Sequence, residues 1–428
     1  MAQRKHWSAE ALGQVSNSTT TWANVVTLNV PADEQTAGAA YVLFWSVELQ
    51  SPSQVQDVMV RVVVNGVAGA EGRFDSAETM SPVDYSAPGG FVIFSAGETP
   101  AAATFQLQYR SEAAGVACLA KRARLTLLAL ASLDAHVENL GRQTTNVRWS
   151  TAMQTAATLT FTPSSAGDYL ILASALIDVA GFSVCEGYFD LYDGAEASPR
   201  QGVYKRADTD VVPVVAMWRR DGISGLQQVR FRWAADNHSS TAPTVGISEV
   251  RIVALHLDRF DSAHSALLSV SSEGADAADV DALTLSGMVS ASPHLALAAW
   301  TTIGSNSPEE TAFASFVDNG TLVGEVVREP TSSIPYNNNG GWPAFVHRAV
   351  TYEAGARTWK LRRRSEATSI SRMYAGAMIA VLDLGLPRAE ARGLAAGTST
   401  AQARARAFHG RAGRAAGAAT ATGRRGWF

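Results

Sequence analysis

One segment of the sequence combines the residue types that bind sugars. It spans residues 334–343, which we expect to form a loop, and contains a tyrosine, three consecutive asparagines and a tryptophan. Aromatic faces stack on the C–H surfaces of sugar rings, and Asn amides both donate to and accept from hydroxyls. The alternative is a turn rich in Asn and Gly, because such turns need positive φ angles. The glycan-binding interpretation predicts these contact residues: Tyr336, Asn337, Asn338, Asn339 and Trp342.

The other candidates for chemistry are weaker. The sequence contains no G-x-S-x-G nucleophile elbow, no P-loop and no G-x-G-x-x-G after a strand. His256 and His264 lie close together but have no Cys or acidic partner at a metal-ligand spacing. The carboxylates at 273, 276, 279 and 281 could ligate calcium, but without the EF-hand pattern they are typical of a solvated loop. We therefore predict no catalytic residues, no metal, no cofactor and no enzyme.

Composition and charge limit the class of protein. The 428 residues are 46% hydrophobic and 17% charged, which suits packed cores. A net charge of −4 gives no indication of a nucleic-acid partner. Apolar runs stay below the roughly 18–20 residues that span a bilayer, and no apolar stretch follows the basic start, so we predict no membrane insertion and no signal peptide. Two cysteines, Cys118 and Cys185, exclude a disulfide-stapled module.

Sequence features recur with a period of about 126 residues, which is the signature of internal repeats. The apolar segment Tyr41–Trp45 matches segments at 169–173 and 294–298. A turn dipeptide recurs at Asn65-Gly66, Asp193-Gly194 and Asn319-Gly320. Two further apolar segments follow each turn in the same order. We therefore predict that one unit is written three times.

Each unit has the pattern of an all-β domain. Apolar and polar residues alternate in Val229–Trp233, as in a strand with one face in a core and one in solvent. Asn-Gly and Asp-Gly between such strands favour type I′ hairpins. Some eight strands per unit suit a β-sandwich, most closely a jelly roll, with an immunoglobulin-like sandwich as the alternative. The fold prediction is all-β: three tandem jelly-roll-like β-sandwich repeats at 1–136, 137–263 and 264–386, and a low-complexity segment at 387–428.

The last 42 residues differ in composition. Residues 387–428 hold eight Arg, one Glu and fourteen Ala, so they carry +7 and the rest of the chain carries −11. The letters L-A-A-G-T-S-T-A at 394–401 match R-A-A-G-A-A-T-A at 414–421. We predict that this segment docks against other chains through Arg414, Trp427 and Phe428. The alternative is a disordered extension, since few large apolar groups are available for burial.

The tandem sandwich pattern, the missing catalytic motifs and the repeated A-A-G-x-x-T-A segments resemble structural proteins of tailed bacteriophages and phage-like gene transfer agents. The best-matching types are tail fibres and head spikes. The resemblance implies a virion protein that is assembled in the host cytoplasm and released by lysis. It implies other virion proteins and a host surface polysaccharide as partners. A bacterial surface adhesin or carbohydrate-binding module is one alternative, and a glycan depolymerase is another.

Attachment to sugars depends on multivalency, because single-site affinity is low and avidity multiplies it. We therefore predict a homotrimer. The competing interpretation is a monomer whose three repeats form a pseudo-threefold cluster and replace three chains by one.

Overall fold

The computed structural model describes residues 6–50, 57–74, 85–131, 133–139, 145–148, 152–180, 185–205, 210–237, 244–303, 312–328, 340–365 and 370–385. Most of them lie in β-strands, and their two helices are single 3-10 turns, η1 (Ala32–Glu34) and η2 (Leu257–Arg259). The all-β prediction is confirmed. Residues 1–387 form one compact unit, and residues 388–428 form a second unit that lies outside the described residues, together with the predicted docking residues Arg414, Trp427 and Phe428.

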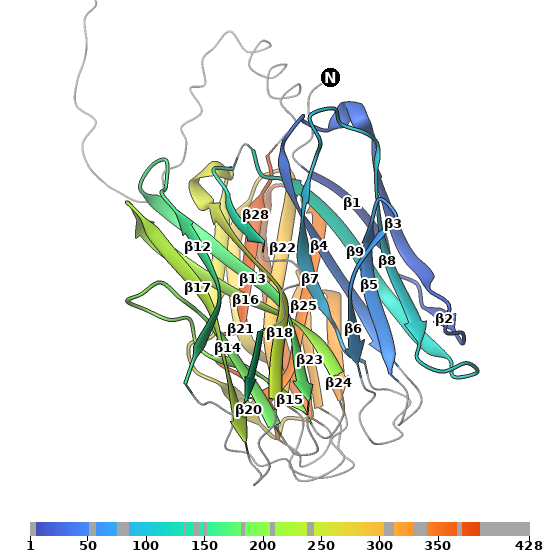
Figure 1. The fold of residues 1–428 in the computed structure, drawn as a ribbon. Coiled ribbons are helices and arrows are strands. Elements are labelled where there is room, and N and C mark those ends of the chain that lie inside the picture. The colour runs from blue at the N-terminus through green and yellow to red at the C-terminus, as the bar shows by residue number, and fades with distance from the viewer. Residues whose placement is uncertain are drawn as a thin grey trace, which may run out of the picture. The chain divides into compact units, whose positions relative to one another are not determined.

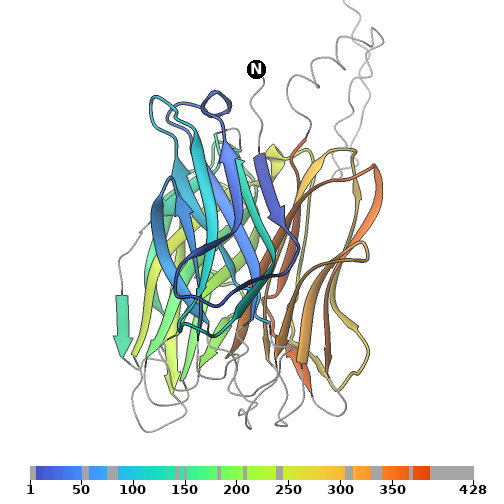
Figure 2. The same ribbon diagram turned by 90° about the vertical axis from the view of Figure 1, so that its right-hand side faces the viewer.

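The first sandwich packs two antiparallel sheets (Figures 1 and 2). Its strands are β1 (His6–Ala11), β2 (Val15–Asn17), β3 (Ala23–Val30), β4 (Ala40–Gln50), β5 (Val58–Val64), β6 (Val67–Phe74), β7 (Gly89–Ser95), β8 (Ala103–Ser111) and β9 (Cys118–Ala129). One sheet has the order β1-β9-β4-β7, with β2 also paired to β9, and the other has the order β3-β8-β5-β6. When β1 and β2 count as one strand, the orders are 1-8-3-6 and 2-7-4-5, the pattern of a jelly roll.

The second and third sandwiches have the same strand orders among the described residues. The second has β10-β18-β13-β16, with β11 beside β18, and β12-β17-β14-β15; the third has β19-β28-β22-β25, extended by β27 and β20, and β21-β26-β23-β24. The second sandwich contains β10 (His136–Asn139), β11 (Thr145–Arg148), β12 (Gln154–Phe161), β13 (Gly167–Ala180), β14 (Cys185–Tyr192), β15 (Gln201–Lys205), β16 (Asp210–Ile223), β17 (Gln227–Asn237) and β18 (Thr244–His256). The third contains β19 (Ala263–Leu267), β20 (Ser272–Gly274), β21 (Val280–Val289), β22 (Pro293–Ile303), β23 (Ala312–Asp318), β24 (Thr321–Arg328), β25 (Gly340–Thr351), β26 (Gly355–Ser365), β27 (Ser371–Met373) and β28 (Met378–Asp383). The jelly-roll-like fold class is confirmed, while the exact repeat boundaries stay predictions.

Two of the three predicted hairpin turns have the type I′ signature. Asn65 and Gly66 have φ angles of 49° and 81°, and Asn319 and Gly320 have φ angles of 46° and 88°. In the remaining turn, Asp193-Gly194, only Gly194 has a positive φ, because Asp193 begins a longer loop. The Asp193 carboxylate accepts hydrogen bonds from the next backbone N–H groups, those of Ala195 (3.0 Å) and Glu196 (2.8 Å).

One backbone irregularity recurs at a fixed interval. Arg122, Glu249 and Gly376 have φ angles of 49°, 54° and 94°, and each stands 127 residues from the next. In the first two sandwiches the position coincides with a register shift between β4 and β9 and between β13 and β18. A bulge bends and twists the strand that contains it. The recurrence supports a common origin for the three sandwiches, which the apolar pattern alone had suggested.

One sheet of each sandwich is buried on both faces. In β4, Tyr41 and Leu43 belong to the interior of the first sandwich, whereas Val42 and Phe44 belong to a separate apolar cluster. Residues from the other two sandwiches also belong to that cluster. We call this cluster the shared core. Its members from the middle strands include Val42, Phe44, Leu170, Leu172, Leu295 and Leu297. Burial on both faces explains why these strands are almost continuously apolar in sequence.

Each of the three sandwiches contacts both of the others. Strand β6 of the first packs against β16 of the second, and β15 of the second pairs in parallel with β25 of the third through Gly202 and Gly340. Strand β24 of the third returns to the first, where Tyr85 and Val327 exchange two backbone hydrogen bonds of 2.9 Å. This closed arrangement is the one expected if the repeats of one chain cluster together. Association into a homotrimer stays a prediction.

Candidate functional site

Only part of the predicted sugar-binding segment lies within the described residues. Tyr336, Asn337, Asn338 and Asn339 lie outside the described residues. Trp342 was expected in a loop, but it lies inside β25, half-buried and paired with Thr302 of β22. The apolar run of β25 extends back to Gly340, and a Cβ on Gly341 would lie 2.4 Å from the Thr302 carbonyl oxygen, so only glycine allows this close approach of the strands.

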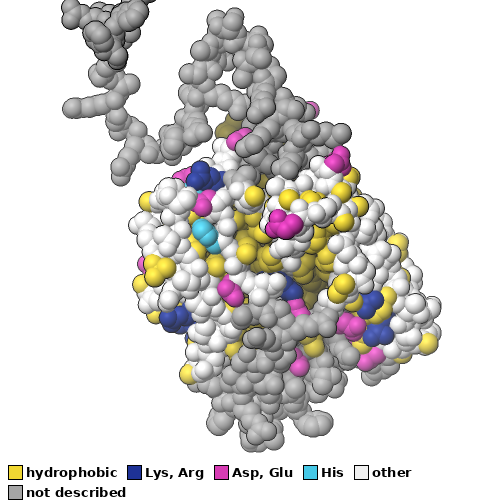
Figure 3. Space-filling view, turned by 45° about the horizontal axis from the view of Figure 1, so that its top comes forward, with side chains coloured by type: hydrophobic (Ala, Val, Ile, Leu, Met, Phe, Trp, Pro, Cys, Tyr) yellow, Lys and Arg dark blue, Asp and Glu magenta, His cyan; other side chains and the backbone are white. Residues whose placement is uncertain are grey.

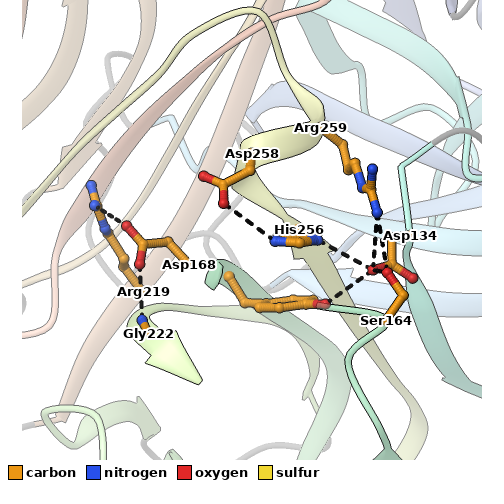
Figure 4. A network of polar contacts seen from close by, with 9 residues as sticks. Asp134, Ser164, Asp168, Arg219, Gly222, His256, Asp258 and Arg259 are labelled. Atoms are coloured by element: carbon orange, nitrogen blue, oxygen red, sulfur yellow. Dashed lines mark hydrogen bonds and ion pairs between the residues drawn. The ribbon is translucent and has the colours of Figure 1, made fainter. Parts of the chain in front are cut away.

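A polar network ties the connection between the first and second sandwiches to the body of the second sandwich (Figure 4). At its centre, the Asp134 carboxylate accepts hydrogen bonds from Ser164, from Nδ1 of His256 at 3.2 Å and from the Tyr169 hydroxyl at 3.4 Å. The Arg259 guanidinium lies 3.8 Å from the same carboxylate. Burial opposes ionisation of Asp134, but the hydrogen bonds from Ser164 and His256 hold its pKa below the usual value. Burial and the adjacent Asp134 charge raise the pKa of Tyr169 to about 12.

The network contains a serine, a histidine and aspartates, but its geometry is not that of a catalytic triad. Ser164 donates to Asp134 rather than to His256, so the imidazole is not placed to activate its hydroxyl as it would in a triad. His256 is 1% exposed, and a Cβ on Gly167 would lie 2.1 Å from its Nε2. The imidazole is therefore covered by backbone on one side and stacked on Tyr169 on the other, at a centroid distance of 4.6 Å. This arrangement fixes the connection between the sandwiches.

A second ion pair lies beside this network. Asp168 accepts hydrogen bonds from the Arg219 guanidinium at 2.8 Å and from the backbone N–H of Gly222 at 2.9 Å (Figure 4). Both partners belong to the end of β16, while Asp168 belongs to the start of β13. The contacts therefore tie together the ends of two neighbouring strands.

The third sandwich has a buried His–Asp pair at the equivalent strand position. His294 of β22 pairs in register with Asp383 of β28, as Tyr169 pairs with His256 in the second sandwich. The Asp383 carboxylate accepts hydrogen bonds from Ser290, from Ser292 at 2.6 Å and from the backbone N–H of Gly385 at 2.8 Å. Nε2 of His294 lies 3.6 Å from Asp383. These partners satisfy a carboxylate that is 1% exposed, which is a structural role.

The carboxylates at 273, 276, 279 and 281 are neutralised by basic side chains that are distant in sequence. The ion pairs are Glu273–Arg372, Asp276–Arg363, Asp279–Arg362, Asp279–Arg364, Asp281–Lys360 and Asp281–Arg362. Lys360, Arg362 and Arg364 alternate along β26 and therefore share one face of its sheet, whereas Arg363 lies on the buried face and Arg372 belongs to β27. Within the described ranges, no group of three or more His, Cys, Asp or Glu side chains could hold a metal ion.

Apolar side chains gather in a hollow on the face drawn in Figure 3, with acidic and basic side chains around it. Contact with another apolar surface is the chemistry that such a hollow offers. In the described part of the chain, no helix is long and apolar enough to cross a membrane.

Comparisons with known proteins give only distant structural similarity. No family model and no curated protein matches the chain. The solved structure of the infectious bursal disease virus VP2 subviral particle is 10% identical, with a TM-score of 0.22 over 93% of this chain and 84% of that one. An archaeal virus protein described by its triple jelly roll fold and turret assembly is 9% identical, with a TM-score of 0.19 over 88% of this chain and 91% of that one. An exo-beta-agarase is 11% identical, with a TM-score of 0.17 over 28% of this chain and 23% of that one. Similarities at these TM-scores support no functional assignment.

Proposed function

We propose that this protein is a non-enzymatic structural component of a virion surface, a fibre or spike of the tailed-phage or gene-transfer-agent kind that attaches the particle to host glycans. The observation that carries the proposal is the closed arrangement of three jelly rolls around the shared core. A single chain then presents three lobes in fixed geometry, which is what a multivalent attachment protein needs. The polar clusters around Asp134 and Asp383 hold strands and connections of the sandwiches together. This structural role favours a structural protein over an enzyme.

We assign the glycan contact to residues 336–342, which lead from β24 into the start of β25. Tyr336, Asn337, Asn338, Asn339 and Trp342 supply the aromatic and amide groups that this recognition requires. Trp342 is half-buried at the start of β25, so its backbone is fixed while part of the side chain stays accessible. The partner contacts with other virion proteins are assigned to residues 387–428, with Arg414, Trp427 and Phe428 as the anchors.

The virion location is tested by imaging particles with a specific antibody. Purified particles from a lysate are labelled with gold-conjugated antibody and examined by negative-stain microscopy. We expect gold at particle surfaces. Label that remains in the soluble fraction and never sediments with particles contradicts the proposal.

The glycan contact is tested by Trp342→Ala in particles. Removing an exposed stacking aromatic costs about 1 kcal/mol or more per contact, which is roughly fivefold in affinity, and avidity multiplies the loss over several sites. Leu226→Ala is the control, because Leu226 is a large apolar residue that is 68% exposed in the second sandwich. We expect slower adsorption to cells for Trp342→Ala alone, with normal incorporation of both variants. Equal adsorption would place the receptor contact elsewhere.

The depolymerase alternative has its own assay. Dye-labelled capsular polysaccharide is incubated with the purified chain, and soluble dye is measured over time. We expect no release above that from heat-denatured protein. Steady release by the native chain would contradict the non-enzymatic assignment.

A further inference from the structure

The contact between the third and first sandwiches differs from the other two because no peptide connection crosses it. The first sandwich continues into the second between β9 and β10, and the second continues into the third between β18 and β19. The third sandwich meets the first only through non-covalent contacts. We call these contacts the 3–1 seam. Because no linker holds the first and third sandwiches together, the closed arrangement can open at this seam.

Backbone groups of β24 supply several polar contacts at the 3–1 seam. Val327 exchanges two 2.9 Å hydrogen bonds with Tyr85, and the Val323 carbonyl accepts a 2.8 Å bond from Arg124. The N–H of Glu325 donates to the Glu48 carboxylate at 3.0 Å. The amides of Glu325 and Val327 therefore report directly whether the seam is closed.

Two charged side chains at the seam, Glu48 and Arg124, are buried. The Glu48 side chain is 1% exposed and is held by Lys121 at 3.3 Å and by Arg122 at 2.8 Å. Burial lowers the pKa of Arg124 to about 10. Burial and the Glu48 charge raise the pKa of Glu325. Protonation or deprotonation of a side chain at the seam therefore changes the net charge buried there.

A histidine occupies the seam where the other two sandwiches have apolar residues. His347 of β25 pairs with Leu297, as Phe91 pairs with Phe44 and Met217 pairs with Leu172. Its side chain is fully buried, and Nδ1 lies 3.1 Å from the hydroxyl of Ser46 in the first sandwich. Among the described residues, Nε2 has no hydrogen-bond partner.

Among the described residues, the groups that face His347 supply no negative charge to balance an imidazolium. Strand β4 contributes the Ser46 hydroxyl and the Phe44 ring, whose centroid is 6.1 Å from the imidazole. Strand β25 contributes the Phe345 ring, also at 6.1 Å. The charge that acts on His347 is that of Arg124 on β9, which has the same sign as an imidazolium. A buried cation without a partner is strongly unfavourable, so protonation favours any state in which the imidazole reaches water.

We propose that the 3–1 seam is an acid-sensitive latch, in which protonation of His347 releases the third sandwich from the first. The device is a property of the chain itself and does not depend on the proposed attachment function.

The direction of the effect follows from linkage. Burial and the Arg124 charge hold the pKa of His347 well below its ordinary value of 6.5. The stability of the closed seam is therefore fully present above pH 6.5 and falls as the pH drops below it, by up to about tenfold in the closed-to-open ratio per pH unit. Glu325 acts in the opposite direction, because its raised pKa favours the closed seam as the pH falls towards 4.5. Glu325→Gln removes this opposing effect and should steepen the loss.

Hydrogen exchange of the full chain tests the latch. Exchange is measured by mass spectrometry at pH 7.5 and pH 5.0, and rates are corrected for the intrinsic pH dependence of exchange. We expect peptides that contain the Glu325 and Val327 amides to lose protection by about tenfold or more at pH 5.0. Peptides from the centre of β13 should keep theirs, because a local opening does not unfold the second sandwich.

Two variants isolate the role of His347. His347→Phe and His347→Met introduce the residues found at the equivalent positions of the first and second sandwiches, and both should remove the pH dependence at the seam. His264→Gln is the control, because His264 is a half-buried histidine whose hydrogen bond, to the Met288 carbonyl at 3.1 Å, lies within the third sandwich and away from the seam. Unchanged protection in the natural chain at pH 5.0, or an equal loss in the two His347 variants, would overturn the proposal.

Discussion

Replacing Phe44 by alanine tests whether the three sandwiches share one core. Phe44 is fully buried on the outer face of its sheet, with ring centroids of Phe91 at 6.0 Å and of Phe345 at 6.3 Å. An aromatic side chain of this kind buries about 150–250 Å², which at about 25 cal/mol per Å² corresponds to about 4–6 kcal/mol. Measured Phe→Ala substitutions in cores cost about 3–5 kcal/mol. We therefore expect a loss of about 4 kcal/mol, a large fraction of the stability of a typical domain.

The assay is urea unfolding followed by tryptophan fluorescence and by far-UV circular dichroism. If the core is shared, the natural chain unfolds in one transition, because no sandwich keeps its doubly buried sheet when its neighbours are lost. Leu172→Ala and Leu297→Ala, at the equivalent positions of the other sandwiches, should move the same transition by about 2–5 kcal/mol each. Leu226→Ala at an exposed position should change stability by less than about 0.5 kcal/mol.

The result that would refute this reasoning is a set of separate transitions. If Phe44→Ala moves only a part of the signal and leaves the rest at its original urea concentration, the sandwiches fold independently. A loss no larger than that of Leu226→Ala would show that the outer face of β4 is not packed.

Three further predictions concern buried groups inside single sandwiches and their connections. Gly167→Ala should destabilise the chain by about 1–3 kcal/mol in thermal unfolding, because the new Cβ would lie 2.1 Å from His256 Nε2; a neutral effect would mean that this contact relaxes freely. In a Cys185→Ser background, iodoacetamide at pH 8 should react with Cys118 only after urea is added, since burial raises the pKa of this thiol to about 11; rapid alkylation of the folded chain would contradict its burial. Asp383→Asn should lower the unfolding free energy by about 2 kcal/mol or more, because charge-assisted bonds from two serines and a backbone N–H weaken; an unchanged midpoint would show that this carboxylate is dispensable.

The sequence predicted most of the strands because their patterns are local. Alternation in Val229–Trp233 marked a strand with one face inside a sandwich, and β17 has that pattern of burial. The Asn-Gly turns at 65–66 and 319–320 followed from residue chemistry, whereas Asp193-Gly194 differed because an aspartate can cap a longer loop through its own side chain. The continuous apolar run at Tyr41–Trp45 also contained the signal for burial on both faces, although the sequence analysis used it only to mark a strand.

The polar connections could not be predicted because their partners are distant in sequence. Asp134 meets Ser164 and His256, which lie 30 and 122 residues away, only when the second sandwich has folded. The seam contact between Ser46 and His347 spans 301 residues. Trp342 was assigned to a loop because its neighbours are Asn, Gly and Pro, yet pairing with β22 placed it in a strand. Tertiary pairing decided these positions, and local propensity did not.

The closed arrangement of the three sandwiches within one chain is tested most directly by a disulfide across the 3–1 seam. Tyr85 and Val327 exchange both backbone hydrogen bonds, so their Cα atoms are about 5.5 Å apart, within the range of a disulfide. The double variant Tyr85→Cys/Val327→Cys is oxidised and run on a non-reducing gel beside each single variant. We predict a compact band at the mobility of one chain, formed by the double variant alone and lost on reduction. Disulfide-linked dimers or trimers, or two free thiols after oxidation, would contradict the closed single-chain arrangement.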